Sequence, residues 1–186
     1  MCVIFLSERL VAGKRARGEA GAPGDIGPPG GADAAAVIRP VRREDLREII
    51  ALDAAVTGIE KRAYWNAVFR RYAVAGEAQR QFLVAEDGGR VAGFVIGEVR
   101  DWEFGSPPCG WVFAIDVRPD ARQRGVGARL LAAISAGFRR AGVTKVRTML
   151  ARDNTLILSF FRSQGMMAGP FIPLEMDLEL GRGQRP

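Results

Sequence analysis

Residues 122–128 read Arg-Gln-Arg-Gly-Val-Gly-Ala and hold the groups in this chain best suited to chemistry. They follow a strand-like apolar run that ends at Pro119, and they precede apolar residues at helical spacing. The first turn of a helix leaves its backbone N–H groups unpaired, and the helix dipole favours negative charge there. Gly125 and Gly127 have no Cβ, so the backbone can approach a bulky diphosphate. The pattern indicates a phosphate-binding strand–turn–helix.

Histidine is absent from the sequence, which narrows the chemistry further. Its absence excludes Ser-His-Asp and Cys-His nucleophiles and every metal site with a histidine ligand. The two cysteines, Cys2 and Cys109, form neither a disulfide framework nor a zinc-binding spacing. We therefore expect no metal, and a general base must be a carboxylate, tyrosine, lysine or water.

The candidate catalytic bases are Asp116, Glu98, Asp101 and Glu103, and the first two are favoured. Asp116 lies between Ile115 and Val117 inside an apolar strand, where partial burial would raise its pKa toward a useful value. An aspartate at a strand edge, exposed or bonded to a loop, explains the same residue equally well. Glu98 is near the end of the preceding strand and could reach the same cleft, directly or through water. A solvated strand end is its alternative interpretation.

A short irregular segment supplies most of the candidate substrate contacts. Trp102, Glu103 and Phe104 lie between two predicted strands, and loop residues of this kind often carry binding functions. Tyr64, on a predicted helix, could form another wall of an acceptor pocket. Trp65 and Trp111 are expected in the core instead, as large aromatic residues usually are.

Composition is that of one globular domain: 186 residues, 48% hydrophobic and 26% charged, with a net charge of +6. Residues 1–35 hold four basic and four acidic side chains, so the excess positive charge belongs to the rest of the chain. No basic stripe interleaved with aromatic residues is visible, so a small polyanion is favoured over nucleic acid as the partner. No apolar run is long enough for a membrane span or a signal peptide, and a cytoplasmic location is expected.

Element patterns predict a mixed α/β domain on a twisted sheet. We expect a disordered extension at 1–35, one domain at 36–180 and a flexible tail at 181–186. The expected strands are 37–41, 81–86, 91–99, 110–117, 144–150 and 174–180, the last from its strict alternation of apolar and acidic residues. The expected helices begin near 44, 60, 125 and 154.

This order of elements resembles the GNAT superfamily of acetyl-coenzyme A-dependent N-acetyltransferases. The run 115–128 is similar to the superfamily's pyrophosphate-binding signature, and Asn154 with 160–166 resembles its later coenzyme-binding segment. The resemblance covers 37–180 and implies the GNAT fold, with a mostly antiparallel sheet and helices on both faces. It also implies a coenzyme site made of Ile115, Asp116, Val117, Arg122, Gln123, Arg124, Gly125, Val126, Gly127, Ala128, Asn154 and Phe161.

The resemblance implies acetyl transfer to a primary amine of a small molecule or peptide, by direct attack in a ternary complex. Two catalytic groups of many relatives are missing, because Phe161 stands where a tyrosine would protonate the thiolate and Met149 where a glutamate base would lie. A catalytically weak or inactive coenzyme-binding sensor is therefore the alternative. The sequence leaves the acceptor and a homodimer open.

Overall fold

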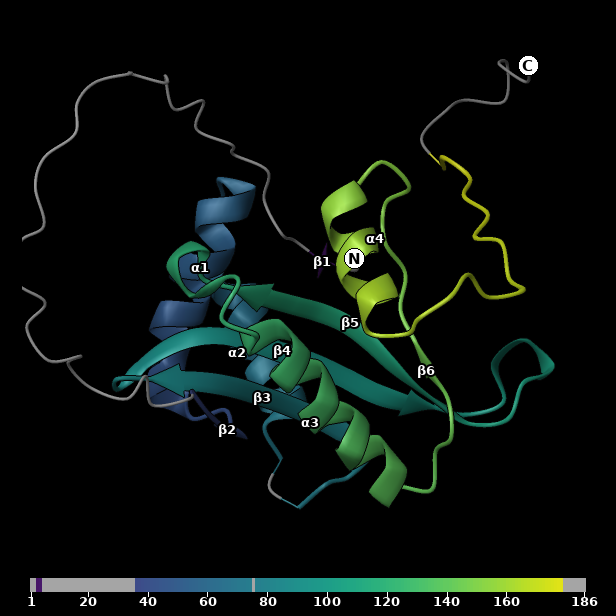
Figure 1. The fold of residues 1–186 in the computed structure, drawn as a ribbon, viewed down its shortest axis with the longest axis horizontal. Coiled ribbons are helices and arrows are strands. Elements are labelled where there is room, and N and C mark those ends of the chain that lie inside the picture. The colour runs from purple at the N-terminus through teal and green to yellow at the C-terminus, as the bar shows by residue number, and fades with distance from the viewer. Residues whose placement is uncertain (1–2, 5–35, 75, 179–186) are drawn as a thin grey trace, which may run out of the picture.

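A six-stranded sheet forms the centre of the structure, a computed structural model that describes residues 3–4, 36–74 and 76–178 (Figure 1). Its strands are β1 (Val3–Ile4), β2 (Val37–Pro40), β3 (Arg80–Asp87), β4 (Arg90–Arg100), β5 (Cys109–Val117) and β6 (Val146–Arg147). Strands β2 to β5 pair antiparallel in the order β5-β4-β3-β2, and β1 and β6 both run parallel to β5. The predicted mixed α/β class and mostly antiparallel sheet are confirmed.

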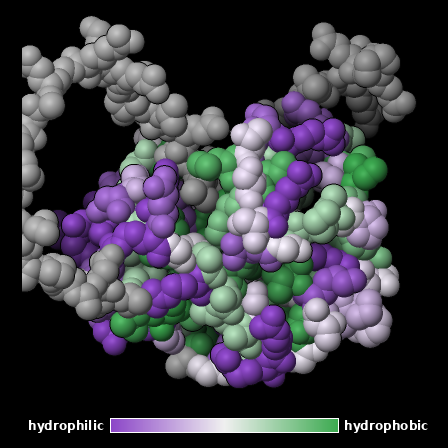
Figure 2. Space-filling model, in the orientation of Figure 1, coloured by the Kyte–Doolittle hydropathy of each residue, from purple (hydrophilic) through white to green (hydrophobic). Residues whose placement is uncertain are grey.

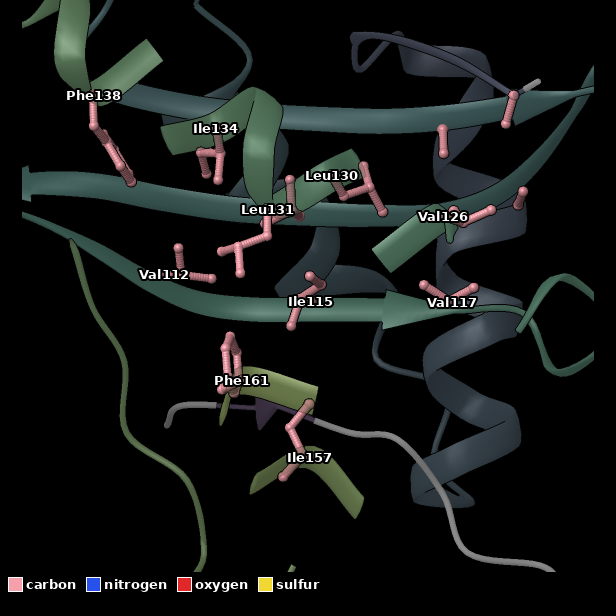
Figure 3. Packing of buried hydrophobic residues seen from close by; sticks show 14 of the residues in the cluster. Val112, Ile115, Val117, Val126, Leu130, Leu131, Ile134, Phe138, Ile157 and Phe161 are labelled. Atoms are coloured by element: carbon pink, nitrogen blue, oxygen red, sulfur yellow. The ribbon is translucent and has the colours of Figure 1, made fainter. Parts of the chain in front are cut away.

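Helices cover both faces of this sheet (Figure 1). One face packs against α1 (Leu46–Thr57) and α2 (Arg62–Tyr72), which follow the short 3-10 turn η1 (Arg43–Asp45). The other face packs against α3 (Val126–Arg140) and α4 (Thr155–Ser163). Figure 3 shows this second core, in which Ile157 and Phe161 of α4 point toward Val112 and Ile115 of β5. Alternation along the strands separates the two cores, because neighbouring side chains point to opposite faces.

The β3–β4 connection is the tight turn that its sequence predicts. Asp87 pairs with Arg90, and the two residues between them, Gly88 and Gly89, have φ of 56° and 77°. Left-handed conformation at both central positions matches the twist of a two-residue hairpin. This local signal makes β3 and β4 antiparallel neighbours.

A paired carboxylate fixes the entry into α1. Arg39 of β2 donates hydrogen bonds to both oxygens of Asp45, at 2.7 and 2.8 Å, and a third to Glu86 of β3, at 2.6 Å. Asp45 also accepts the backbone N–H of Arg42 at 2.6 Å. The network ties β2, β3 and η1 together where the domain begins.

Two predicted strands differ from the structure. The strand predicted at 144–150 is reduced to β6, because the hydroxyl of Thr148 donates to the carbonyl oxygen of Val112 (2.8 Å) where the ladder would continue. The strand predicted at 174–180 is wrong over 174–178, where the chain is irregular and Leu174 is 92% exposed. Alternating apolar and acidic residues fit one buried and one exposed face of a strand, but the strand also needs a partner strand to pair with. No strand pairs with 174–178 among the described residues.

The chain termini are described in part. Of the extension predicted at 1–35, the structure describes only Val3–Ile4, which form β1. The tail predicted at 181–186 lies outside the described residues. The domain limits at 36 and 180 stay predictions.

We predict that Gly97→Ala destabilises the fold by about 3 kcal/mol, because overpacking forces the backbone or core side chains to shift. A Cβ at Gly97 of β4 would lie 2.5 Å from the carbonyl oxygen of Trp111 and 2.9 Å from the ring of Phe138. Urea unfolding measures the change. Gly169→Ala is the control, since its Cβ would meet nothing within 4 Å. Equal stability of the two variants would contradict the packing argument.

Candidate functional site

The turn between β5 and α3 has the backbone that the sequence predicts for an anion site. After the 3-10 turn η3 (Pro119–Ala121), Gln123 and Gly125 adopt left-handed conformations, with φ of 67° and 72°. Left-handed residues in such a turn direct successive N–H groups into one concavity. The N–H of Arg129 is the one that bonds the carbonyl of Gly125 (3.1 Å), so Val126 to Ala128 form the first turn of the helix. Their N–H groups lie in the turn that has no intrahelical acceptors.

The two arginine side chains of the turn are held against the protein. The Nε of Arg122 donates to the carbonyl oxygen of Val117 (3.1 Å), and an Nη of Arg122 lies 3.9 Å from the carboxylate of Asp116. Arg124 reaches the β3–β4 turn and pairs with Asp87 at 2.6 Å. Both guanidinium groups therefore lie beside the turn, with the charge of Arg124 offset by Asp87.

The two glycines of the turn serve different purposes. A Cβ at Gly125 would meet nothing within 4 Å, so this residue is needed for its left-handed backbone. A Cβ at Gly127 would lie 3.2 Å from the ring of Phe160 and 3.7 Å from Val117. Gly127 thus allows α4 to pack closely on α3, and close packing is the alternative interpretation that the sequence offers for this glycine.

The outer edge of β5 changes its partner strand along its length. β6 pairs only with Gly110 and Trp111, and the Thr148 hydroxyl takes the carbonyl of Val112. Beyond this point Ala114 and Ile115 pair in parallel with β1. The edge that leads into the phosphate-type turn is therefore paired with β1, and an extended ligand could pair there only in place of β1.

The same stretch of β5 contains an irregularity. Opposite β4 the register shifts, so that Ile96 faces Ala114 while Gly97 faces Val112. Phe113 is the extra residue of this β-bulge. Bulges bend a strand and re-aim its side chains, and they are common beside active sites.

Helix α4 places its two predicted coenzyme residues in structural contacts. The side-chain oxygen of Asn154 accepts the N–H of Ile157 (3.1 Å) and caps the helix. Phe161 is buried in the core beside β5 (Figure 3). Its ring has no hydroxyl with which to protonate a leaving group.

Asp116 is a buried carboxylate on the α1–α2 face of β5. It is 3% exposed, opposes Phe94 across the sheet and accepts the N–H of Val117 (2.7 Å). Burial raises the pKa of Asp116 to about 7, against the lowering effects of that N–H and of Arg122, and nearby Asp53 raises it further. The sequence prediction of a desolvated carboxylate is consistent with this placement.

Glu98 lies well away from Asp116. Asp116 opposes Phe94 whereas Glu98 opposes Trp111, so about 15 Å of strand separates the two positions. The expectation that both carboxylates could serve one cleft is therefore corrected. The reason is the antiparallel register, which the sequence does not reveal.

Two neighbouring side chains hold Glu98 in place. Tyr72 of α2 donates its hydroxyl to one carboxylate oxygen (2.8 Å), and the Nε of Arg100 donates to the other (3.2 Å). Burial raises the pKa of Tyr72 to about 12, with the Glu98 bond adding to it, so the hydroxyl stays a donor at neutral pH. The Tyr72 ring lies 5.0 Å from that of Phe113 at the bulge.

The sequence analysis missed Tyr72 as a functional candidate, because the residue forms part of the apolar stripe of α2. A tyrosine on a buried stripe must find a partner for its hydroxyl, and this was the available signal.

Glu98 lines a polar hollow of about 570 Å³ at one end of the sheet. Its lining residues are Arg71, Gln79, Arg80, Glu98, Val99, Arg100, Asp101 and Glu103. Of the predicted substrate contacts, Glu103 lies in this lining. Trp102 and Phe104 are 69% and 74% exposed next to it, in and beside the 3-10 turn η2 (Glu103–Gly105).

The fourth predicted contact, Tyr64, is placed elsewhere. It packs edge-on against Trp65 (5.3 Å between ring centroids) near the start of α2, with Lys61 over its ring. Eight residues separate it from Tyr72, which is about 12 Å along a helix. The structure does not bring Tyr64 to the hollow.

Comparison with known proteins identifies the family. The model of the acetyltransferase (GNAT) family matches residues 44–166, which is more than half of the chain. The chain belongs to the GNAT family. This match includes the β5–α3 turn, the hollow and α4, and the sequence-based resemblance is confirmed.

Two curated relatives are acetyltransferases. A mycothiol acetyltransferase of Saccharomonospora viridis is 30% identical over 145 residues, covering 70% of this chain and 46% of the relative. An L-2,4-diaminobutyric acid acetyltransferase of Nocardia farcinica is 33% identical over 87 residues, or 47% of this chain and 44% of the relative. The chain thus spans about half the length of the curated relatives it matches.

Solved structures confirm the GNAT fold. The aminoglycoside N-acetyltransferase AAC(6')-Iy in complex with CoA has a TM-score of 0.69 and 20% identity, covering 82% of this chain and 99% of that one. Glucosamine-6-phosphate N-acetyltransferase from Arabidopsis thaliana has a TM-score of 0.61 and 18% identity, covering 77% and 99%.

Asp116 should make the stability of the fold depend on pH. The pKa of Asp116 is about 7 in the folded protein and about 3.9 in the unfolded chain. Its contribution to the free energy of unfolding is therefore fully present below pH ~4 and is lost as pH rises to ~7. The loss is at most about 4 kcal/mol. Urea unfolding from pH 4.5 to 8 should show the difference in stability between the protein and Asp116→Asn changing over this range. Parallel curves would show that Asp116 ionises normally.

Proposed function

We propose that this GNAT protein is an N-acetyltransferase that transfers an acetyl group from acetyl-CoA to a primary amine, by direct attack in a ternary complex. The observation that carries the proposal is the continuity of β5 and the turn. The strand edge at Ala114 and Ile115, which pairs with β1 and which an extended ligand would take in place of β1, runs directly into the left-handed turn at Gln123 and Gly125. An extended thiol arm and a diphosphate on one molecule match these two features in the same order.

In this proposal the backbone amides of 123–128 bind the diphosphate, and Arg122 and Arg124 add positive charge near it. The backbone of 115–117 pairs with the pantetheine arm. Asn154, at the start of α4, lies beside the arm and also caps that helix, while Phe161 supports the arm from the core beneath it. The turn has left-handed residues and the positive end of a helix, as such a ligand requires.

Glu98 is the favoured base. It lies in a hollow that a small molecule can enter, and Tyr72 and Arg100 fix its orientation. A positioned carboxylate can take a proton from the amine, directly or through one water. Asp116 remains the alternative base, but at 3% exposure a substrate amine cannot reach it without movement of the surrounding chain.

The leaving group needs less help. A thiol has a pKa of about 8.5, so a thiolate can depart near neutral pH without an obligatory acid. The lack of a hydroxyl at Phe161 is therefore compatible with turnover. Aligning amine and thioester then supplies much of the rate.

Several accompanying expectations stay predictions: a cytoplasmic location, a homodimer and independence from metal. No described helix is long and apolar enough to cross a membrane. No group of three or more candidate metal ligands occurs among the described residues. On the face of the described residues drawn in Figure 2, hydrophilic and hydrophobic residues are interspersed.

Coenzyme binding is tested by Gly125→Val, with Gly142→Val as its matched control. Both glycines are left-handed, have open space around them and lie at opposite ends of α3. Each substitution should therefore lower stability by about 1–2 kcal/mol. Calorimetry with acetyl-CoA should show an affinity loss of at least tenfold for Gly125→Val alone. Equal affinities of the two variants would remove the turn from the proposed site.

Catalysis is tested by Glu98→Gln. A thiol-release assay over a panel of amines should show kcat/KM lowered about 10²- to 10³-fold, with coenzyme affinity unchanged. Glu60→Gln is the control, because Glu60 is an exposed residue paired with Arg62. Coenzyme binding without turnover of any amine would instead favour the alternative, an inactive coenzyme-binding sensor.

A further inference from the structure

The hollow around Glu98 has a charge pattern that restricts what it can bind. Its lining holds three arginines and three acids, so its formal charge is zero although the chain as a whole carries +6. The acids are Glu98, Asp101 and Glu103, and the arginines are Arg71, Arg80 and Arg100. A hollow lined with fixed charges of both signs favours a ligand that also carries both.

The carboxylates of Glu98 and Glu103 can accept more hydrogen bonds than their neighbours donate. Each Glu98 oxygen accepts one hydrogen bond, from Tyr72 or Arg100, which leaves further lone pairs on both. One oxygen of Glu103 is buried without a hydrogen-bond partner among the described residues. An Nη of Arg100 lies 3.7 Å from this oxygen. Buried acceptors of this kind are expected to bind donors, and an amine supplies them.

The guanidinium groups of Arg71 and Arg80 can donate more hydrogen bonds than their acidic neighbours accept. Arg71 lies 3.7 Å from Glu98, and Arg80 lies 3.5 Å from Glu77, both at the long limit of an ion pair. By contrast, Arg39 of the β2 network bonds its carboxylate at 2.7 and 2.8 Å. The side chains of Arg71 and Arg80 are 63% and 43% exposed, so both guanidinium groups can be reached from solvent.

Arg71 and Arg80 also lie next to each other. An Nη of Arg80 donates to the backbone carbonyl of Arg71 at 3.5 Å, which brings strand β3 to the end of α2. Two adjacent guanidinium groups with free N–H groups can bind one carboxylate or phosphate through several charge-assisted hydrogen bonds.

We propose that the acceptor is a small amine that also carries an anionic group, a carboxylate or a phosphate, a few bonds away. Arg71 and Arg80 bind the anion, and Glu98 and Glu103 receive the amine. Because Arg71 lies only 3.7 Å from Glu98, one small molecule can reach both groups. This inference rests on the proposed N-acetyltransferase function and adds the substrate class.

Matched pairs of amines test this substrate class. Thiol release from acetyl-CoA is measured with 2,4-diaminobutyrate against 1,3-diaminopropane, and with glucosamine 6-phosphate against glucosamine. In at least one pair the anionic member should have a kcat/KM at least tenfold higher. A preference for 2,4-diaminobutyrate indicates a carboxylate, and a preference for glucosamine 6-phosphate indicates a phosphate.

Arg80→Gln should then raise the KM of the preferred anionic amine about tenfold, as expected for the loss of a charge-assisted hydrogen bond, and leave that of its neutral counterpart unchanged. Arg62→Gln is the control, since Arg62 is exposed on α2, pairs with Glu60 and lies outside the hollow. Calorimetry with acetyl-CoA should give the same affinity for both variants.

The results distinguish a failure of this inference from a failure of the proposed N-acetyltransferase function. Turnover of amines with no preference in either pair, or an equal loss for both members with Arg80→Gln, overturns the anionic acceptor and leaves the N-acetyltransferase intact. Failure to acetylate any amine overturns the proposed function and the inference together.

Discussion

Strand β5 loses its parallel neighbour β6 after Trp111, and the arrangement of the candidate site depends on this early end. β6 pairs with two residues only, and the hydroxyl of Thr148 closes the ladder. Beyond that point the outer edge of β5 pairs with the two-residue strand β1 and then leads to the turn at Gln123, where the left-handed backbone collects the amides of α3. A longer β6 would have taken the place of β1 along this edge.

The two carboxylates show how position in one sheet creates different chemistry. Asp116 faces α1 and α2 with few polar neighbours, so burial dominates and raises its pKa to about 7. Glu98, toward the other end of β4, is held by Tyr72 and Arg100 and opens into a polar hollow. Environments of this kind assign different roles to chemically similar groups. The Tyr72 ring also packs against Phe113 at the bulge of β5.

Features with a local cause could be predicted from the sequence. The glycine pair at 88–89 and the start of α3 after Gly125 depend on backbone conformations that neighbouring residues determine. Features that depend on a residue distant in the sequence could not be predicted. Tyr72 meets Glu98 across 26 positions, and Gly127 packs against Phe160 of another helix. The alternation at 174–178 suggested a strand, but a strand also requires a neighbour, and the described residues provide none.

The pairing of Val3–Ile4 with Ala114 and Ile115 bears on how any ligand affinity of this protein should be understood. One strand edge offers a single set of hydrogen-bonding groups. An extended molecule that used these groups would have to displace β1, which belongs to the same chain and is therefore present at high effective concentration. The affinity observed for such a molecule would be the difference between two binding free energies, and the amino-terminal sequence would contribute to it without touching the ligand.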